Sequence, residues 1–177
     1  MTVPSVSERP EIAFLALSHS KNRNILSFPL NSERSYTAEN LLLSSKLLVV
    51  EDIQDTRELL HLYFTNAGFA VSIASDGLEG LCLTKVEKPD AIITDLAMPR
   101  LDGMEMIKRL RKDPDTANIP VIVFTAHGSV TPEEAQESGA EAIFYKPFDF
   151  DELVKIVKLM VQQNDNSLGA QSGPRPK

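Results

Sequence analysis

Short apolar runs alternate with helical patterns through the middle of the chain. The apolar runs cover residues 47–50, 70–74, 91–94, 121–124 and 142–145. The first, third and fourth runs are almost continuously apolar, as expected for strands whose sheet is covered by helices on both faces. Strict alternation of strands and helices predicts a parallel sheet with right-handed crossovers. We therefore expect one doubly wound α/β domain over residues 46–163.

The first predicted helix carries signals at both ends. Asp55 and Glu58 have the spacing of a capping pair, and Gly68 can adopt the left-handed conformation that ends a helix. The residues between these signals predict a buried helix face made of Leu59, Leu60, Tyr63 and Phe64.

Two later helices have similar signals. One is expected to begin at Thr131 and Pro132 and to end at Gly139. The last helix is expected to begin near Asp149 and Glu152, which again have the spacing of a capping pair. Its apolar residues follow the i, i+3, i+4, i+7, i+8 spacing of a buried face, namely Leu153, Ile156, Val157, Met160 and Val161.

The segments on either side of this domain lack such regularity. Residues 1–45 show no sustained periodicity and are expected to form an irregular or disordered extension. A short run such as 11–17 could still dock on the domain. Residues 164–177 are expected to form a flexible tail.

Composition limits the classes of protein that remain. The 177 residues suffice for one ordinary domain with flanking segments. The formal net charge is −7, so the average field repels nucleic acid, and we expect no direct nucleic-acid binding. The single cysteine, Cys82, suits a reducing cytoplasm and is expected to pack in the core. No apolar run approaches the roughly 20 residues that span a bilayer, so we expect a cytoplasmic protein without membrane insertion.

Polar residues follow four of the five predicted strands. Glu51 and Asp52 follow the first strand, Asp95 the third, Thr125 the fourth and Lys146 the fifth. In a doubly wound sheet these strand ends meet at the edge where ligands bind. Clustered carboxylates favour a hard cation such as Mg²⁺, and an aspartate can act as a nucleophile towards a phosphoryl group. Each residue alone could instead be a helix cap or a solvated charge, but all five share one edge.

These residues lie in motifs that resemble the receiver domains of two-component response regulators. The motifs are LLVVED at 47–52, ITDLAMP at 93–99, LDG at 101–103, VFTA at 123–126 and KPF at 146–148. The resemblance covers residues 46–163 and implies a five-stranded parallel sheet of the flavodoxin-like order 2-1-3-4-5.

The resemblance also implies roles for the site residues. Asp95 would be the phosphoacceptor. Mg²⁺ would be bound by Asp52, Asp95 and the backbone carbonyl of Ala97, with Glu51 contributing through water. Thr125 would move towards the phosphoryl group and Lys146 would pair with it. The Lys146–Pro147 peptide bond would be cis.

Two positions depart from the family's usual residues, and two more lie where the family tunes the lifetime of the phosphoryl group. Receivers often carry an aromatic residue three positions before the lysine, where this chain has Ile143. Tyr145 shares a strand face with Ile143 and is not an obvious replacement. Glu51 is one methylene longer than the more frequent aspartate. Ala97 and His127 flank the path of the hydrolytic water in the family, so His127 either influences phosphoryl lifetime or is a solvated loop residue.

Other candidate features are interpreted as structural. Asp102 and Gly103 are expected to form a turn before a helix rather than part of the active site. A basic cluster follows, flanked by acidic residues, and is expected to be a solvated face made of Lys108, Arg109, Arg111 and Lys112.

We therefore expect a stand-alone signalling switch rather than an enzyme that turns over a metabolite. A sensor histidine kinase or a phosphotransfer protein would phosphorylate Asp95 with Mg²⁺, and the domain would then regulate an output protein. The tail is too short to form a DNA-binding output domain. One alternative is an interaction module that works without phosphorylation, which Ile143 favours. A second is a phosphatase with an aspartyl-phosphate intermediate, but such enzymes typically carry a second acid where this chain has Ala97.

Overall fold

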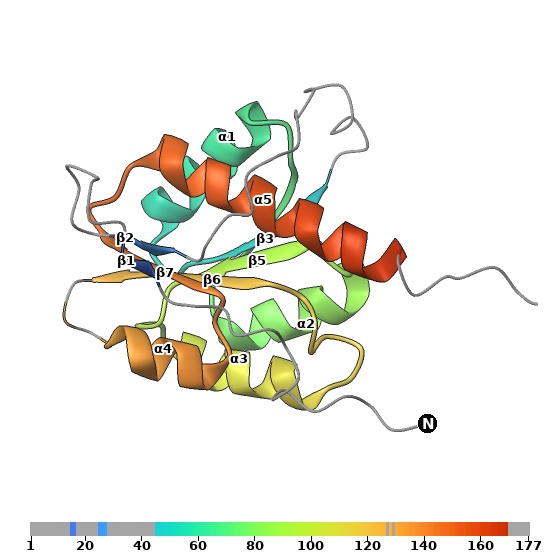
Figure 1. Ribbon diagram of the computed structural model, residues 1–177. Helices are drawn as coiled ribbons and strands as arrows, with labels where there is room; N and C mark the ends of the chain where they lie inside the picture. Colours follow the sequence, from blue (N-terminus) through green and yellow to red (C-terminus); the bar gives the residue numbers. More distant parts are fainter. Residues whose placement is uncertain (1–14, 17–24, 28–44, 127, 129, 170–177) are drawn as a thin grey trace, which may run out of the picture.

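A computed structural model describes residues 15–16, 25–27, 45–126, 128 and 130–169. Five strands of one twisted sheet run parallel to one another (Figure 1). Read from the β4 edge, they lie in the order β4-β3-β5-β6-β7. This is the predicted order 2-1-3-4-5 when β3 is counted as strand 1. Their bounds are β3 (Lys46–Val50), β4 (Ala70–Ala74), β5 (Ala91–Thr94), β6 (Val121–Ala126) and β7 (Ala142–Lys146).

Helices cover both faces of this sheet. One face packs against α1 and α5, and the other against α2, α3 and α4 (Figure 1). The helices are α1 (Gln54–Asn66), α2 (Gly77–Glu87), α3 (Gly103–Lys112), α4 (Pro132–Ser138) and α5 (Phe150–Gly169). Because the sheet is covered on both sides, the predicted doubly wound α/β class is confirmed.

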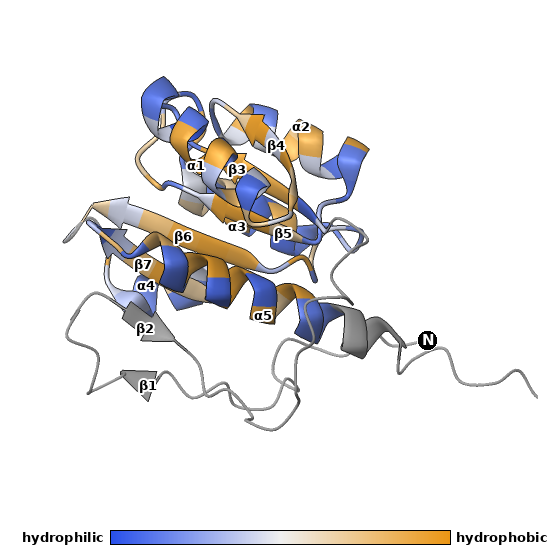
Figure 2. Ribbon diagram, turned by 90° about the horizontal axis from the view of Figure 1, so that it is seen from above, coloured by the Kyte–Doolittle hydropathy of each residue, from blue (hydrophilic) through white to orange (hydrophobic). Residues whose placement is uncertain are grey.

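The strand periodicity divides the core into two layers. Leu47 and Val49 of β3 pack on the α1–α5 side, whereas Leu48 and Val50 pack on the α2–α4 side. All four side chains are at most 1% exposed. Burying a side chain of this size stabilises the fold by about 1.5–3 kcal/mol. Figure 2 shows the resulting apolar central strands and the alternating polar and apolar faces of α5.

Two short strands near the N-terminus extend the sheet beyond β7. Strand β1 (Leu15–Ala16) pairs with β2 (Ile25–Ser27), and β2 pairs antiparallel with β7. The rest of residues 1–45 lies outside the described residues, so the predicted irregular extension stays a prediction. At the other end, α5 continues to Gly169, past the predicted boundary at residue 163.

The end of α1 and both ends of α4 agree with the sequence, whereas the start of α1 does not. Gly68 and Gly139 have φ angles of +98° and +97°, and Thr131 forms a capping box with Glu134. The predicted Asp55–Glu58 capping pair is wrong, because α1 starts at Gln54 without a side-chain cap. Leu59 is also not buried as predicted; it is 49% exposed because the buried stripe of α1 runs through Leu60 and Phe64.

Cys82 is exposed on α2, so the prediction that it packs in the core is wrong. The helix buries its small residues Gly77, Gly80 and Thr84 instead. A Cβ on Gly80 would lie 2.8 Å from the Met106 sulfur, so α2 and α3 approach more closely than larger side chains allow. Leu78 and Val86 of α2 are 46% and 75% exposed, while Leu81 and Leu83 pack partly against the core.

The basic cluster on α3 is only partly a solvated face. Arg109 pairs with Glu105 at the surface. The Arg111 side chain is only 16% exposed and donates to the carbonyl oxygens of Gly139 and Ile119 as well as to Glu141. Arg111 thus joins α3 to the connection between α4 and β7, and its predicted solvation is wrong. In the described part of the chain, no helix has the length and apolar character needed to cross a membrane.

Candidate functional site

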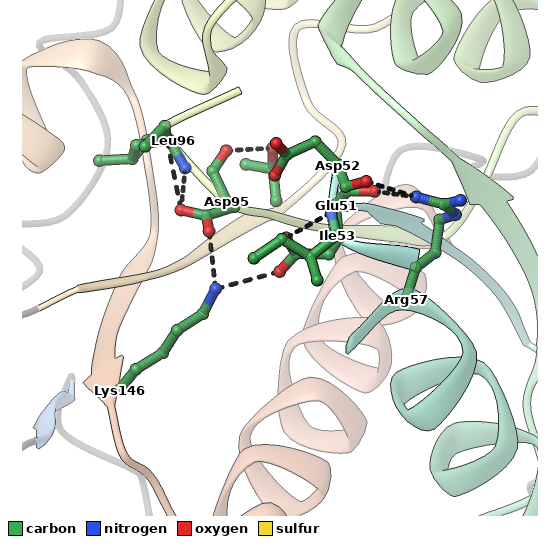
Figure 3. Close-up of polar contacts among 9 residues, drawn as sticks. Glu51, Asp52, Ile53, Arg57, Asp95, Leu96 and Lys146 are labelled. Carbon is green, nitrogen blue, oxygen red and sulfur yellow. Dashed lines mark hydrogen bonds and ion pairs between the residues drawn. The ribbon is translucent and has the colours of Figure 1, made fainter. Parts of the chain in front are cut away.

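The acidic pair lies where β3 ends and is held by the first turn of α1. The backbone N–H of Glu51 continues the sheet by donating to the Ala74 carbonyl at 3.1 Å. Arg57 Nη1 donates to the carbonyl oxygens of Glu51 and Asp52 at 2.6 and 3.1 Å. These bonds fix the backbone from which both carboxylates project (Figure 3).

The two carboxylates have different surroundings. Glu51 is fully buried, and its oxygens accept from the Ile53 N–H at 3.1 Å and from Lys146 Nζ at 3.0 Å. Burial raises the pKa of the Glu51 carboxyl group, and the hydrogen bond from Lys146 opposes part of that increase. Asp52 is half-buried, and its carboxylate makes no hydrogen bond or ion pair with another described residue.

Asp95 follows β5 and is 6% exposed. Its N–H donates to the Val50 carbonyl at 3.0 Å, which places it beside the acidic pair. Asp95 Oδ1 accepts from the N–H groups of Leu96 and Ala97 at 2.6 and 3.3 Å, while Oδ2 accepts from Lys146 Nζ at 2.6 Å. The carboxylate is therefore oriented by its own loop on one side and by Lys146 on the other (Figure 3).

Lys146 joins the two buried carboxylates. Its ammonium group reaches both Glu51 and Asp95 and lies 4.6 Å from the centre of the Phe124 ring. Burial would lower the pKa of Lys146, but its hydrogen bonds to Asp95 and Glu51 outweigh burial and raise the pKa. Lys146 is therefore a fixed cation, and the peptide bond to Pro147 is cis, as expected.

Thr125 lies near the end of β6 with no exposed surface. Its hydroxyl oxygen is buried and has no hydrogen-bond partner among the described residues. A buried hydroxyl without a partner costs about 1–3 kcal/mol, so such groups in native proteins need an explanation. Strand β6 lies between β5 and β7, which places Thr125 between the strands that carry Asp95 and Lys146.

Gly103 supports the site in a way that the sequence interpretation missed. Its N–H donates to the Leu96 carbonyl at 3.0 Å, and a Cβ at this position would lie 2.2 Å from the Asp95 carbonyl oxygen. Asp102 caps α3 through the Glu105 N–H at 2.8 Å. The predicted turn is therefore a helix cap pressed against the backbone of Asp95. The Asp102–Gly103 pair was the available signal, but spacing alone does not reveal this close approach.

The sequence interpretation also missed a second pair of residues that supports the site, Asp76 and Arg100. Asp76 is fully buried and caps α2 by accepting from the N–H groups of Leu78 and Glu79. Its other carboxylate oxygen pairs with Arg100, a residue of the β5–α3 connection with a φ of +65°. This pair ties the connection that follows Asp95 to the start of α2.

The donor set suits Mg²⁺ chemically. Asp52 and Asp95 offer carboxylate oxygens and Ala97 offers a backbone carbonyl, all hard ligands. Within the described ranges, no group of three or more His, Cys, Asp or Glu side chains is arranged to hold a metal, and Glu51 faces Lys146. Mg²⁺ commonly keeps several waters and uses only one or two carboxylates, so two aspartates and a carbonyl fit such an ion.

The remaining predicted positions are distributed as follows. Ile143 is fully buried in the core layer on the α2–α4 side. Tyr145 lies in the same layer, as strand alternation predicted, and its hydroxyl donates to the Val130 carbonyl at 2.9 Å. Ala97 is exposed at the site, and His127 lies outside the described residues.

Comparison with known proteins identifies the family. The model of the response regulator receiver domain matches residues 47–158, and the chain belongs to this family. The DNA-binding dual master transcriptional regulator RpaA of Synechocystis is 34% identical over 68% of this chain and 50% of its own length. Response regulator MprA of Mycobacterium bovis is 34% identical over 73% of this chain and 56% of its own length. The chain thus spans about half the length of these curated relatives and has the receiver domain of a two-component signalling system.

Solved structures agree with the fold. A putative response regulator from Chloroflexus aurantiacus has a TM-score of 0.64 and 35% identity, over 67% of this chain and 98% of that one. The receiver domain of the sensor histidine kinase PA1611 from Pseudomonas aeruginosa has a TM-score of 0.62 over 67% of this chain and 98% of that one. It has been solved with magnesium coordinated in its active-site cleft, but at 24% identity it bears on the fold alone.

The expectation of no direct nucleic-acid binding is wrong in the light of RpaA. That relative is a DNA-binding regulator, and this chain matches half of its length. The expectation rested on the net charge of −7, which describes only the average field of the chain. An average charge on a receiver domain does not decide whether a response regulator binds DNA.

Proposed function

We propose that Asp95 accepts a phosphoryl group from a phosphohistidine of a sensor kinase or phosphotransfer protein. The carboxylate oxygen that faces Lys146 attacks phosphorus, the P–N bond breaks, and the imidazole keeps the electron pair and takes up a proton. The observation that carries this proposal is the position of Asp95: its carboxylate is nearly buried, oriented by two backbone N–H groups and 2.6 Å from a lysine ammonium. Such preorganised charge stabilises a transferring phosphoryl group.

The neighbouring residues would each act on a stated atom. Oδ1 would remain on the Leu96 and Ala97 N–H groups, so the attacking oxygen keeps its direction. Lys146 would follow the new negative charge from the carboxylate to a phosphoryl oxygen. The Thr125 hydroxyl, which has no partner among the described residues, would donate to another phosphoryl oxygen.

Magnesium would be held by Asp52, Asp95 and the Ala97 carbonyl. When bound, Mg²⁺ supplies charge that offsets repulsion between the carboxylates and the incoming phosphoryl group. Glu51 would act mainly as a counter-ion of Lys146, because its carboxylate oxygens already accept from Lys146 and Ile53. Its part in metal binding would be through water.

The phosphorylated domain would change its affinity for an output protein in the cytoplasm. The family assignment supports a signalling role, and the named relatives are regulators about twice as long as the match. No external metabolite would be turned over; the chemistry would be limited to the domain's own phosphorylation and dephosphorylation.

The test is to incubate the full chain with acetyl phosphate and Mg²⁺ and to record its intact mass. We expect one phosphoryl group on the wild type and on Asp115→Asn, an exposed aspartate used as a matched control. Asp95→Asn should carry none, and the adduct should be stable in acid and labile in base. Absence of an adduct on the wild type would favour an interaction module that works without phosphorylation. Rapid hydrolysis of many phosphate esters would favour a phosphatase.

A further inference from the structure

Helix α2 presents to solvent an apolar row that is flanked by one acidic and one basic residue. The exposed positions of the helix have the spacing i, i+1, i+4, i+7, i+8, and they are Leu78, Glu79, Cys82, Lys85 and Val86. Residues with this spacing lie on one face of a helix. The apolar row consists of Leu78, Cys82 and Val86, with Glu79 beside its first residue and Lys85 beside its last.

The inner face of α2 explains why this row lies at the surface. The helix packs inward through small residues such as Gly80, where a Cβ would lie 2.8 Å from the Met106 sulfur and 3.1 Å from Val50. A helix with apolar residues on both faces is normally covered on both. In the described part of the chain the outer face stays open, because Leu78 and Val86 are 46% and 75% exposed. A contiguous apolar row of this kind marks a contact surface, whereas single exposed apolar residues do not.

The order of residues along the row makes it complementary to a second copy of itself. A two-fold axis through Cys82 that sets two α2 helices antiparallel places Leu78 of each copy against Val86 of the other. The same axis places Glu79 of each copy opposite Lys85 of the other, so that two pairs of opposite charges form. Parallel helices would instead place like charges opposite each other, which is unfavourable. The charge pattern therefore favours a second copy in the antiparallel orientation.

The bonds that these two charged residues already make are compatible with such pairs. Glu79 accepts from Ser75 through Oε2, and Lys85 lies 2.9 Å from Asp113 with 63% of its side chain exposed. A carboxylate has a second oxygen and an ammonium group has three donors, so each can form a further bond. The bond from Ser75 lowers the pKa of Glu79 and the bond to Asp113 raises the pKa of Lys85, so both groups are charged near neutral pH.

We propose that the outer face of α2 is the contact surface of a homodimer, in which two copies of this chain pack antiparallel across a two-fold axis at Cys82. The contact does not involve Asp95, so it goes beyond the proposed function and forms without a phosphoryl group. Three apolar side chains from each copy make a small interface, so the dissociation constant should be on the order of 100 µM. The fraction of dimer should therefore depend on the concentration of the chain.

Sedimentation equilibrium of the unphosphorylated full chain, over about 10 µM to 1 mM, measures the dimer. Val86→Lys should weaken dimerisation about tenfold, because it places an ammonium group against the apolar Leu78 of the other copy. Leu62→Lys makes the same kind of change at a 60% exposed position of α1, and it should dimerise like the wild type. Equal association of the wild type and Val86→Lys would overturn the proposal. A wild type that stays monomeric would also overturn it and would leave the row to a different protein.

Charge reversal tests the antiparallel pairing. Glu79→Lys and Lys85→Glu each place like charges opposite each other at two symmetry-related positions, and each should weaken dimerisation about tenfold. The double variant Glu79→Lys/Lys85→Glu has the net charge of the wild type and opposite charges at both positions, so it should dimerise like the wild type. Thermal unfolding of each variant confirms that it folds. A double variant as weak as the single variants, or weaker, would overturn the antiparallel arrangement.

Cys82 reports the position of the two-fold axis, because it is the single cysteine of the chain. Packed helices lie about 8–10 Å apart, so two thiols on the axis are within reach of a disulfide. Copper phenanthroline in air should therefore oxidise the wild type to a disulfide-linked dimer about tenfold faster than the Cys82→Ser/Leu59→Cys variant. That variant carries its thiol on α1, at a position that is 49% exposed in the wild type. Equal rates would indicate random collision and would overturn the proposal.

Discussion

Lys146 Nζ lies 2.6 Å from Asp95 Oδ2 and 3.0 Å from Glu51 Oε2, so a single ammonium group neutralises two carboxylates from different strand ends. The Glu51 and Asp95 side chains are 0% and 9% exposed, and that of Lys146 is 30% exposed. The three side chains come from the ends of β3, β5 and β7. Their mutual distances therefore report on the register of the whole sheet.

Removal of the ammonium group should destabilise the resting fold. Lys146→Gln leaves the Asp95 and Glu51 carboxylates without their cation, and we expect a loss of about 2 kcal/mol in the free energy of unfolding. This value is below that of a fully buried pair because water reaches part of Lys146. Urea unfolding at pH 7 measures the loss. Lys85→Gln, which removes a surface pair with Asp113, should unfold with the wild-type midpoint.

Glu51 should make stability depend on pH in a defined direction. Burial raises its pKa in the folded state above the usual 4.5, so the folded protein takes up this proton before the unfolded chain does. The resulting stabilisation is complete below about pH 4.5 and is lost as pH rises through the raised pKa. Glu51→Gln should therefore be more stable than the wild type at pH 7, and the difference should vanish towards pH 4.5. An advantage that grows on acidification would contradict this assignment.

The Thr125 hydroxyl should lower the free energy of unfolding and yet be needed for the response to phosphorylation. Thr125→Val replaces the unpartnered hydroxyl with a methyl group of similar size, and we expect the unfolding free energy to rise by about 1 kcal/mol. The same variant should still accept a phosphoryl group on Asp95, but its phosphorylation should not accelerate amide hydrogen exchange in α4. Thr125→Ser, which keeps the hydroxyl, should retain the phosphorylation response. A less stable Thr125→Val would indicate that the hydroxyl has a partner in solution.

Gly103→Ala should distort the phosphoacceptor loop. The added Cβ would meet the Asp95 carbonyl oxygen at 2.2 Å and the Leu96 Cα at 3.0 Å, both backbone atoms. We expect a loss of about 1–3 kcal/mol in the unfolding free energy and slower phosphorylation by acetyl phosphate. Lys108→Ala, at an exposed position of the same helix, is the control and should leave both measurements unchanged. Wild-type kinetics in Gly103→Ala would show that the loop can yield without moving Asp95.

The two acidic residues after β3 should differ in Mg²⁺ binding. The Asp52 carboxylate has no partner among the described residues, whereas the Glu51 carboxylate is engaged by Lys146 and Ile53. Titration calorimetry should therefore show about tenfold weaker Mg²⁺ binding for Asp52→Asn, and a smaller loss for Glu51→Gln. Equal losses would place both carboxylates on the metal.

The chain's apolar and polar pattern was sufficient to predict the α/β class and to bring the candidate site residues to one edge of the sheet. Strand runs of period two and helix stripes of period 3.6 are local properties, and the switch-point rule then brings Glu51, Asp52, Asp95, Thr125 and Lys146 to one edge. Capping at Thr131 and helix termination at Gly68 and Gly139 also depend on local backbone chemistry. These ends were correctly predicted for that reason.

Long-range packing decided the rest. The exposure of Cys82 follows from the close approach of α2 to α3 at Gly80, and the role of Gly103 from its contact with the Asp95 backbone. The pairing of Glu51 with Lys146, 95 positions apart, and the bond from Tyr145 to Val130 likewise depend on how separate elements meet. The sequence alone determined which chemical groups lie at the candidate site. Only the tertiary structure decided which group each one contacts, because a contact depends on the packing of elements that no local periodicity specifies.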